Sequence, residues 1–266
     1  RGGVHAALRT LDLIYHSIVR DVRKSHRSAI GGLLMSILQT ITFVAAFWVM
    51  FTFLGARGNS IRGDFMLYLM SGIFLFLTHT KAMSAVVKAE GPTSPMMQHA
   101  PLNTFITIAA AALCSVYLQL LSLFVVLFFY HVLVTPITIH DPVGALGMLL
   151  VAWFSGVAIG ILLLAIKPWA PDFTMLLASI WSRANMIASG KMFVANTLPG
   201  YMLAFFDWNP LFHTIDQARG YIFLNYNPHF SSWSYALKVS LVLIVIGLMG
   251  EFFTRRRASA SWKAGH

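Results

Sequence analysis

Acidic residues are scarce in this chain. Only 9 of its 266 residues are aspartate or glutamate, and all charged residues together make up 11%, against roughly 25% in an average soluble domain. Hydrophobic residues make up 58%. A soluble core of this size would not need so many long apolar runs. The composition therefore excludes an ordinary soluble domain and favours a membrane protein.

The same scarcity restricts how such a protein could be energised. None of the acidic residues falls well inside an apolar segment. Carriers coupled to protons or sodium usually need carboxylates at membrane depth. Coupling to ions is therefore disfavoured, so any transport must draw its energy from elsewhere or be passive.

Cysteine and metal-ligand patterns are also lacking. The single cysteine, Cys114, lies in an apolar run, which excludes a disulfide framework and a cysteine metal site. The 10 histidines are scattered, and none has a second histidine and a carboxylate at metal-ligand spacing. We expect no metal and no cofactor bound by this chain.

Catalytic and targeting motifs are absent as well. Gly190-Lys191 is followed by Met192 and has no upstream glycine, so the chain carries no phosphate loop. Neither H-E-x-x-H nor G-x-S-x-G occurs. The first 29 residues are polar and basic without an apolar core, unlike a cleavable signal peptide. We expect a protein that is not itself an enzyme.

Long apolar segments are what the sequence does contain. Each is near the roughly 20 residues that a bilayer core requires. They cover residues 30–54, 65–80, 105–130, 143–166, 173–194 and 235–253, and the second is expected to continue as a helix towards Lys88. No linker or internal repeat divides the chain. The sequence predicts an all-α membrane protein with six transmembrane helices in a single domain, residues 1–266.

The basic residues predict the orientation of these spans. With the N-terminus inside, the cytoplasmic side receives Arg1, Arg9, Arg20, Arg23, Lys24, Arg27, Lys81, Lys88, Lys167, Arg255, Arg256, Arg257 and Lys263. The outer side receives only Arg57, Arg62, Arg219 and Lys238. This bias follows the positive-inside rule and puts both termini in the cytoplasm. The net charge of +10 thus reflects membrane orientation, and no nucleic-acid partner is expected.

Two cytoplasmic segments have their own patterns. In residues 1–29, apolar residues recur at three- and four-residue steps opposite a basic face, which predicts an amphipathic helix in the interface that serves as an anchor or also frames a docking surface. In the loop 91–103, Thr93 or Ser94 could cap a short helix that begins at Pro95. That helix would expose Met96 and Met97 as an adaptable protein contact; an ordinary solvated turn is the alternative.

The outer segment 195–234 is too apolar for a free loop. Asn209-Pro210 is typical of an N-cap followed by a first-turn proline, and predicts a helix to about Gly220. A short helical hairpin that dips back into the membrane fits this pattern, provided it is buried in protein or lines a cavity. Its aromatic residues either line an exit path for a sugar polymer or form an ordinary interfacial belt. They are Tyr201, Phe205, Phe206, Trp208, Tyr221, Tyr226 and Trp233.

The fifth apolar segment contains two cations, Arg183 and Lys191. A helix that enters the bilayer near Asp172 puts Arg183 roughly 16 Å deep and Lys191 roughly 28 Å deep, where Lys191 could snorkel to the far interface. An angular offset of about 80° would let both line one cavity, a substrate path in which Arg183 attracts an acidic cargo. Alternatively, Arg183 caps carbonyls or pairs with Asp207 or Asp216.

Several of these residues together carry a resemblance to a known family. They are Arg183, then Ala188-Ser189-Gly190 with Phe193, Leu198-Pro199, and Trp208-Asn209-Pro210-Leu211-Phe212-His213 followed by Asp216 and Arg219. The chain resembles the membrane permease of ABC-type exporters of capsular polysaccharide and, more distantly, O-antigen. The six-span order, the leader helix and the loop after the second span agree with that family over essentially the whole chain.

The resemblance implies a homodimer in the bacterial inner membrane that exports an acidic, lipid-linked polysaccharide. Each copy would engage a separate cytoplasmic ATPase subunit that binds ATP and Mg, with periplasmic export components and membrane lipids as further partners. Contacts with the ATPase would come from Glu90, Thr93, Pro95, Met96, Met97 and Gln98. A structural re-entrant hairpin would use Pro199, Asn209, Pro210, Asp216 and Arg219.

Three alternatives remain open. The same permease type could export O-antigen, teichoic acid or a small drug. A membrane-embedded transferase could use His79, His131 or His213, although acid–base pairs at membrane depth are scarce. A passive scaffold is the third.

Overall fold

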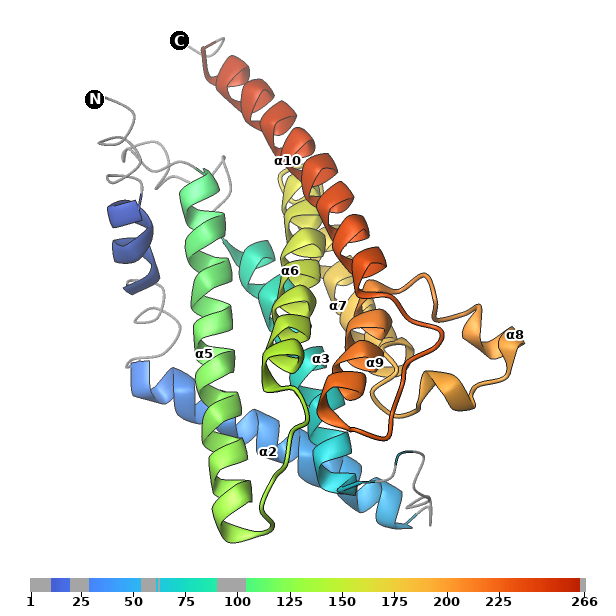
Figure 1. The fold of residues 1–266 in the computed structure, drawn as a ribbon. Coiled ribbons are helices and arrows are strands. Elements are labelled where there is room, and N and C mark those ends of the chain that lie inside the picture. Colours follow the sequence, from blue (N-terminus) through green and yellow to red (C-terminus); the bar gives the residue numbers. More distant parts are fainter. Residues whose placement is uncertain (1–10, 20–28, 54–60, 62, 90–103, 264–266) are drawn as a thin grey trace, which may run out of the picture.

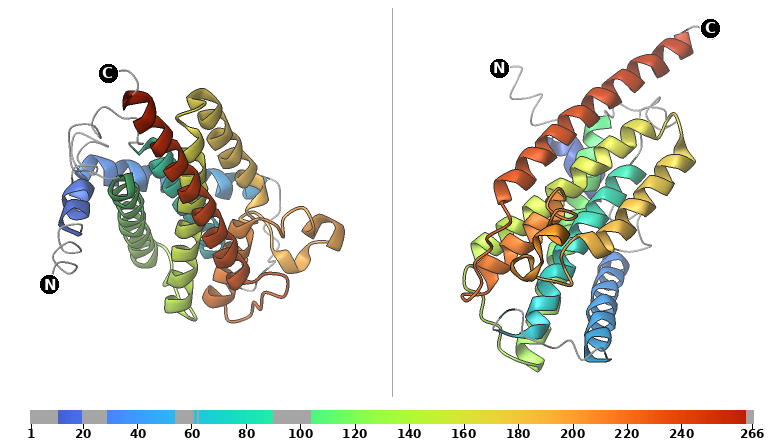
Figure 2. Two further views of the ribbon diagram at one scale, coloured as in Figure 1. Left: turned by 90° about the horizontal axis from the view of Figure 1, so that it is seen from above. Right: turned by 90° about the vertical axis from the view of Figure 1, so that its right-hand side faces the viewer.

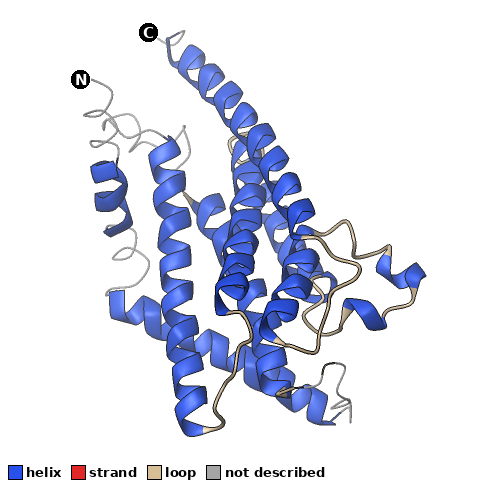
Figure 3. Ribbon diagram, viewed as in Figure 1, coloured by secondary structure: helices blue, strands red, loops and turns tan. Residues whose placement is uncertain are grey.

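The structure is a computed structural model that describes residues 11–19, 29–53, 61, 63–89 and 104–263. Figure 3 shows helices joined by loops, without a strand in these ranges. The described helices are α2 (Ala29–Phe53), α3 (Phe65–Lys88), α5 (Thr104–Leu133), α6 (Pro142–Ile166), α7 (Pro171–Ala188), the 3₁₀ turn η1 (Ala195–Thr197), α8 (Gly200–Leu203), α9 (Pro210–Ile222) and α10 (Trp233–Lys263).

Five of these helices are long and apolar enough to span a membrane: α2, α3, α5, α6 and the part of α10 up to Thr254. Their bounds agree with the predicted segments to within a few residues, except that α10 continues to Lys263. The predicted continuation of the second segment is confirmed, because α3 runs without a break to Lys88. The described residues therefore have an all-helical fold, and the length and composition of these five helices support a transmembrane protein.

The fifth predicted segment differs from the prediction. Its helix α7 has 18 residues and ends at Ala188, six residues earlier than expected, and it is not among the five candidate spans. Ser189 follows as the C-cap, and Gly190 adopts a φ of 74°. This left-handed conformation suits glycine and ends helices, so the chain turns before Lys191.

Side-chain caps and prolines fix where several helices begin. Asp64 accepts a hydrogen bond from Met66 N at the start of α3. Asp141 accepts from the backbone of Val143 and Gly144 at the start of α6. In α6, α7 and α9 a proline occupies the first turn. The N–H that proline lacks would have no acceptor within the helix at that position, so no hydrogen bond is lost.

Helix α3 lies at the centre of the bundle, and α6 packs along it (Figure 1). Gly156 makes this contact close, because a Cβ there would lie 2.2 Å from the carbonyl oxygen of His79. Gly160 similarly faces Val86. The GxxxG pattern thus serves packing within the chain. α10 packs against the other side of α6, and its C-terminal end extends beyond the bundle (Figure 2).

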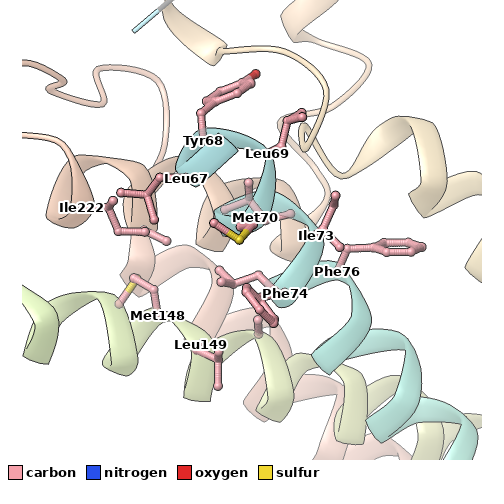
Figure 4. Close-up of a cluster of buried hydrophobic side chains, with 14 of the residues drawn as sticks. Leu67, Tyr68, Leu69, Met70, Ile73, Phe74, Phe76, Met148, Leu149 and Ile222 are labelled. Atoms are coloured by element: carbon pink, nitrogen blue, oxygen red, sulfur yellow. The ribbon is translucent and has the colours of Figure 1, made fainter. Parts of the chain in front are cut away.

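The main apolar core joins α3, α6 and α9. Figure 4 shows Leu67, Met70 and Phe74 of α3 close to Met148 and Leu149 of α6 and to Ile222 of α9. By contrast, α2, α5 and α10 each present exposed apolar side chains on their outer faces, as helices in contact with lipid do.

Two predicted cytoplasmic features are only partly covered. Of the leader, residues 11–19 are described, and they are helical, as expected. The predicted ATPase contacts Glu90, Thr93, Pro95, Met96, Met97 and Gln98 lie outside the described residues. That assignment stays a prediction.

Candidate functional site

The buried face of α9 holds the turn that follows α7. Arg219 is 1% exposed and donates to three backbone carbonyls, of Gly190 at 2.9 Å, Phe193 at 2.6 Å and Lys191 at 2.8 Å. Its guanidinium lies 4.2 Å from the ring centroid of Tyr68 on α3. The Nε atom has no hydrogen-bond partner among the described residues. Arg219 therefore joins α9, α3 and the turn.

Asp216, one turn earlier on the same face, holds the loop that follows α9. Its carboxylate accepts hydrogen bonds from the hydroxyls of Tyr226 and Ser231, the latter at 2.6 Å. Burial and, after it, the negative charge of Asp216 raise the pKa of Tyr226. Tyr226 consequently stays a neutral donor and fixes the loop against α9.

His213 and Asn209 complete this face. The His213 Nδ1 accepts from Ser232 N at 3.0 Å, so its Nε2 carries the proton and donates to the carbonyl of Asp207. Burial lowers the pKa of His213, which favours this neutral form. Asn209 caps α9 and donates from its Nδ2 to Asn185 Oδ1 at 2.8 Å and to the carbonyl of Ala188 at 3.0 Å.

We call Asn209, the N-cap of α9, together with His213, Asp216 and Arg219 of α9 the α9 tie. All four are buried. The hairpin residues expected from the sequence are thus brought together, except Pro199, which caps the separate one-turn helix α8. Helix α8 lies away from the bundle (Figure 1).

Lys191 lies on the inner side of the turn that the α9 tie holds. Its side chain is 2% exposed, and its Nζ lies 3.6 Å from the ring centroid of Phe76, 5.0 Å from that of Phe47 and 5.9 Å from that of Phe43. The Nζ has no hydrogen-bond partner in the described part of the chain. The expectation that Lys191 snorkels to the interface is wrong, because the turn at Gly190 directs it into the bundle.

Arg183 is exposed and lies on α7, on an outward stripe with Phe173, Leu176, Ile180 and Ile187. Within the described ranges it forms no ion pair with Asp207 or Asp216, and Asp216 is instead bonded to two hydroxyls. The expected helical offset between Arg183 and Lys191 does not apply, since α7 ends at Ala188. The structure separates the two cations that the sequence grouped.

The seven candidate exit aromatics do not form one surface. Tyr201, Phe205, Trp208 and Trp233 are exposed, whereas Tyr226 is buried against Asp216. Phe206 is half-buried and packs on Phe193 and Phe212, with ring centroids 4.9 and 6.3 Å away. Tyr221 is also half-buried. Tyr226 and Phe206 thus hold the fold, and the exposed four remain candidates for a sugar path.

A polar seam where α2 meets α3 and α5 was missed. Lys81 Nζ donates to the hydroxyl of Ser36 at 2.7 Å, and Ser36 contacts Gln119 Oε1 at 3.5 Å. Thr40 and Ser122 face each other at 3.5 Å. Apart from half-buried Lys81, these side chains are buried. The signal was present in the sequence as polar residues one turn apart: Ser36 with Thr40, and Gln119 with Ser122.

The histidines proposed for a transferase are already bonded. His79 Nε2 accepts from Trp181 Nε1 at 3.0 Å, so its Nδ1 donates to the Ser155 hydroxyl at 2.8 Å. His131 Nδ1 accepts from Ile137 N at 2.9 Å. Over the described residues, no three histidine, cysteine or acidic side chains are placed to hold a metal. In comparisons with known proteins, no family model matches the chain, and no curated protein does.

Proposed function

We propose that the chain is the permease subunit of an ATP-driven exporter of an acidic, lipid-linked capsular polysaccharide in the bacterial inner membrane. Two copies would assemble with two cytoplasmic ATPase subunits, because this chain has no phosphate loop of its own. The proposal includes six membrane spans and places both termini in the cytoplasm.

One observation carries it. Many of the residues on which the resemblance rests, from Ala188-Ser189-Gly190 to Asn209, His213, Asp216 and Arg219, belong to the α9 tie or to the turn that it holds, whereas Arg183 and Pro199 lie outside it.

The exposed stripe on α7 supports the dimer. Arg183 lies there among large apolar side chains, and an arginine facing lipid at membrane depth costs about 2.5–3.5 kcal/mol. A second copy against this stripe would place Arg183 twice beside a shared path, where an acidic glycan offsets its charge.

Co-purification tests the proposal. The tagged chain, purified from the membranes of its own host, should retain a cytoplasmic ATPase subunit, and a lipid-linked acidic glycan should stimulate ATP hydrolysis by that complex. A complex that forms but responds only to O-antigen, teichoic acid or a drug would keep the transport class and change the cargo. Failure to retain any ATPase would contradict the proposal.

A further inference from the structure

A cavity of about 350 Å³ lies at the end of the bundle where α3 begins. Three segments line it: the start of α3, the loop between α5 and α6 (residues 136–140), and the end of α9 with the residues after it (222–225). Figure 1 shows that loop at the same end of the bundle as the start of α3. The volume is at the small end of the range for ligand pockets, roughly 300–1,000 Å³. The cavity therefore suits a ligand of one or two rings.

Hydrogen bonds between residues far apart in the chain hold the walls of this cavity. The Asp64 carboxylate accepts from the hydroxyl of Tyr130 at 2.6 Å, which joins the start of α3 to the end of α5. His140 N donates to the carbonyl of Ile222 at 3.1 Å, which joins the α5–α6 loop to the end of α9. The cavity is thus built into the packed fold and is not a gap between independent loops.

Polar side chains of the lining are available to a ligand. Those of Thr138, His140 and Asn225 form no hydrogen bond with another described residue. Asp64 already accepts three hydrogen bonds, and a carboxylate can accept about four, so it keeps capacity for a ligand hydroxyl. Together the four side chains offer both donors and acceptors.

Apolar side chains form much of the remaining lining, among them Leu67, Ile137, Ile139 and Phe223. Small-molecule pockets combine apolar walls with a few placed polar groups in this way. A pyranose ring matches such a lining, because its C–H faces pack on apolar side chains while its hydroxyls donate and accept at its edge. A purely apolar ligand would leave the polar side chains without partners and shielded from water, which is unfavourable.

The charge of the lining decides between kinds of sugar. Asp64 is the one acidic side chain among the described residues that line the cavity, and no lysine or arginine is among them. An anionic ligand would be repelled by that carboxylate without finding a cation to offset the repulsion. A cation would find a single carboxylate whose oxygens already accept three hydrogen bonds. An uncharged sugar therefore fits best.

We propose that this cavity is a carbohydrate-binding site for one uncharged pyranose residue. Asp64 accepts from the sugar hydroxyls, Thr138 and Asn225 exchange hydrogen bonds with them, and the apolar walls contact a C–H face of the ring. The chemistry of the lining carries the binding itself, whereas the source of the sugar, an uncharged residue of the exported glycan, rests on the proposed function. The site would then hold the glycan where it leaves the membrane, apart from the α9 tie.

Binding of sugars to the full chain in neutral-lipid nanodiscs, measured by saturation-transfer NMR and calorimetry, tests the site. The probes are the methyl glycosides of glucose, galactose, mannose and N-acetylglucosamine. Methyl glucuronide serves as the charged comparison and sorbitol as the open-chain polyol. We expect at least one uncharged glycoside to bind, and both comparison compounds to bind roughly tenfold more weakly or not at all.

Two variants remove hydrogen-bonding groups from the lining. Asn225→Leu and Thr138→Val keep a similar volume at exposed positions, so the fold should be retained. Each should weaken glycoside binding roughly threefold to tenfold, the effect of one lost hydrogen bond. Asn227→Leu, at an exposed asparagine outside the cavity, is the matched control and should bind as the wild type does.

Histidine modification in the wild-type protein gives a readout that needs no variant to fold. Saturating glycoside should slow the reaction of His140 with diethyl pyrocarbonate but not that of His229, an exposed histidine outside the cavity. Absence of binding by every uncharged glycoside, equal affinity for the glucuronide, unchanged affinity in both variants, or labelling of His140 that ignores the glycoside would each overturn the site. Glycoside binding without a retained ATPase would instead reject the proposed function alone.

Discussion

Arg219 and Lys191 are two almost fully buried cations whose surroundings differ. Arg219 reaches three carbonyl oxygens and lies on the face of Tyr68. Lys191 reaches aromatic rings only, and its amine has no hydrogen-bond partner in the described structure. Removing the donor from a carbonyl that is shielded from water leaves an unsatisfied acceptor and costs stability. Removing an ammonium from the face of a phenyl ring leaves no unsatisfied polar group. The first arrangement holds a fold, and the second leaves a charge available.

The same contrast separates two regions of the molecule. The α9 tie fixes the turn after α7 and the loop after α9 by several hydrogen bonds between elements, although Arg219 Nε and Ser189 Oγ have no partner among the described residues. The α2 seam keeps unpaired donors at Lys191 and Gln119. We therefore expect the first region to be rigid and the second to move.

The largest effect is expected for Arg219→Met. It leaves three carbonyls of the turn without their donor, those of buried Gly190 and Lys191 and of half-buried Phe193, and bonds to charged groups contribute about 1.5–3 kcal/mol each. The chain should lose at least about 3 kcal/mol of stability and fail to accumulate in the membrane. Thermal unfolding in detergent and membrane level measure this. Arg183→Met, at an exposed cation, should accumulate normally; equal loss in both would remove the distinction.

The second largest loss of stability is expected for Gly72→Ala, because Gly72 lies between the two regions. A Cβ there would approach Lys191 Cβ to 2.8 Å and the Arg219 guanidinium to 3.1 Å. Overpacking of this kind typically costs about 1–3 kcal/mol. Gly147→Ala, whose Cβ meets nothing within 4 Å inside α6, should not lower the melting temperature and should raise it slightly, because alanine favours a helix interior over glycine. Equal melting temperatures for the two variants would show that α3 and the turn are not in close contact.

Tyr226→Phe tests the other end of the α9 tie with a smaller change. It removes one hydroxyl from Asp216 and keeps the ring, so Asp216 retains only the bond from Ser231. We expect a loss of about 1–2 kcal/mol, read from thermal unfolding. Tyr201→Phe, on the exposed one-turn helix α8, should change nothing. No difference between the pair would leave Tyr226 as an ordinary apolar contact.

Local signals in the sequence predicted the fold well and the site only in part. Apolar length placed the five candidate spans, and Asn209-Pro210 placed the start of α9, because both depend on residues close together in the chain. The inward path of Lys191 depends on Gly190 and on Arg219, which lies 28 residues from its carbonyl partner at Lys191. Such long-range bonds leave no periodicity, so a straight helix through residue 194 was the natural but wrong expectation.

Pairing across helices set a similar limit at the α2 seam. Ser36 and Thr40 are visible as a polar pair on an apolar helix, but their facing residues, Gln119 and Ser122, come more than 80 positions later. Which polar faces meet is decided by how the helices cross, and a single sequence does not give that.

The most direct test of the contrast between the two regions is Lys191→Met, measured for melting temperature and for surface glycan in cells that lack the native gene. If the amine is a functional cation, Lys191→Met should lower the free energy of unfolding by no more than about 1 kcal/mol, with a correspondingly small fall in melting temperature. The reason is that Met keeps the apolar contacts with Phe47 and Phe76. Surface glycan should be lost, and Lys191→Arg should restore part of it. A Lys191→Met protein that unfolds as readily as Arg219→Met, or one that exports normally, would contradict the account.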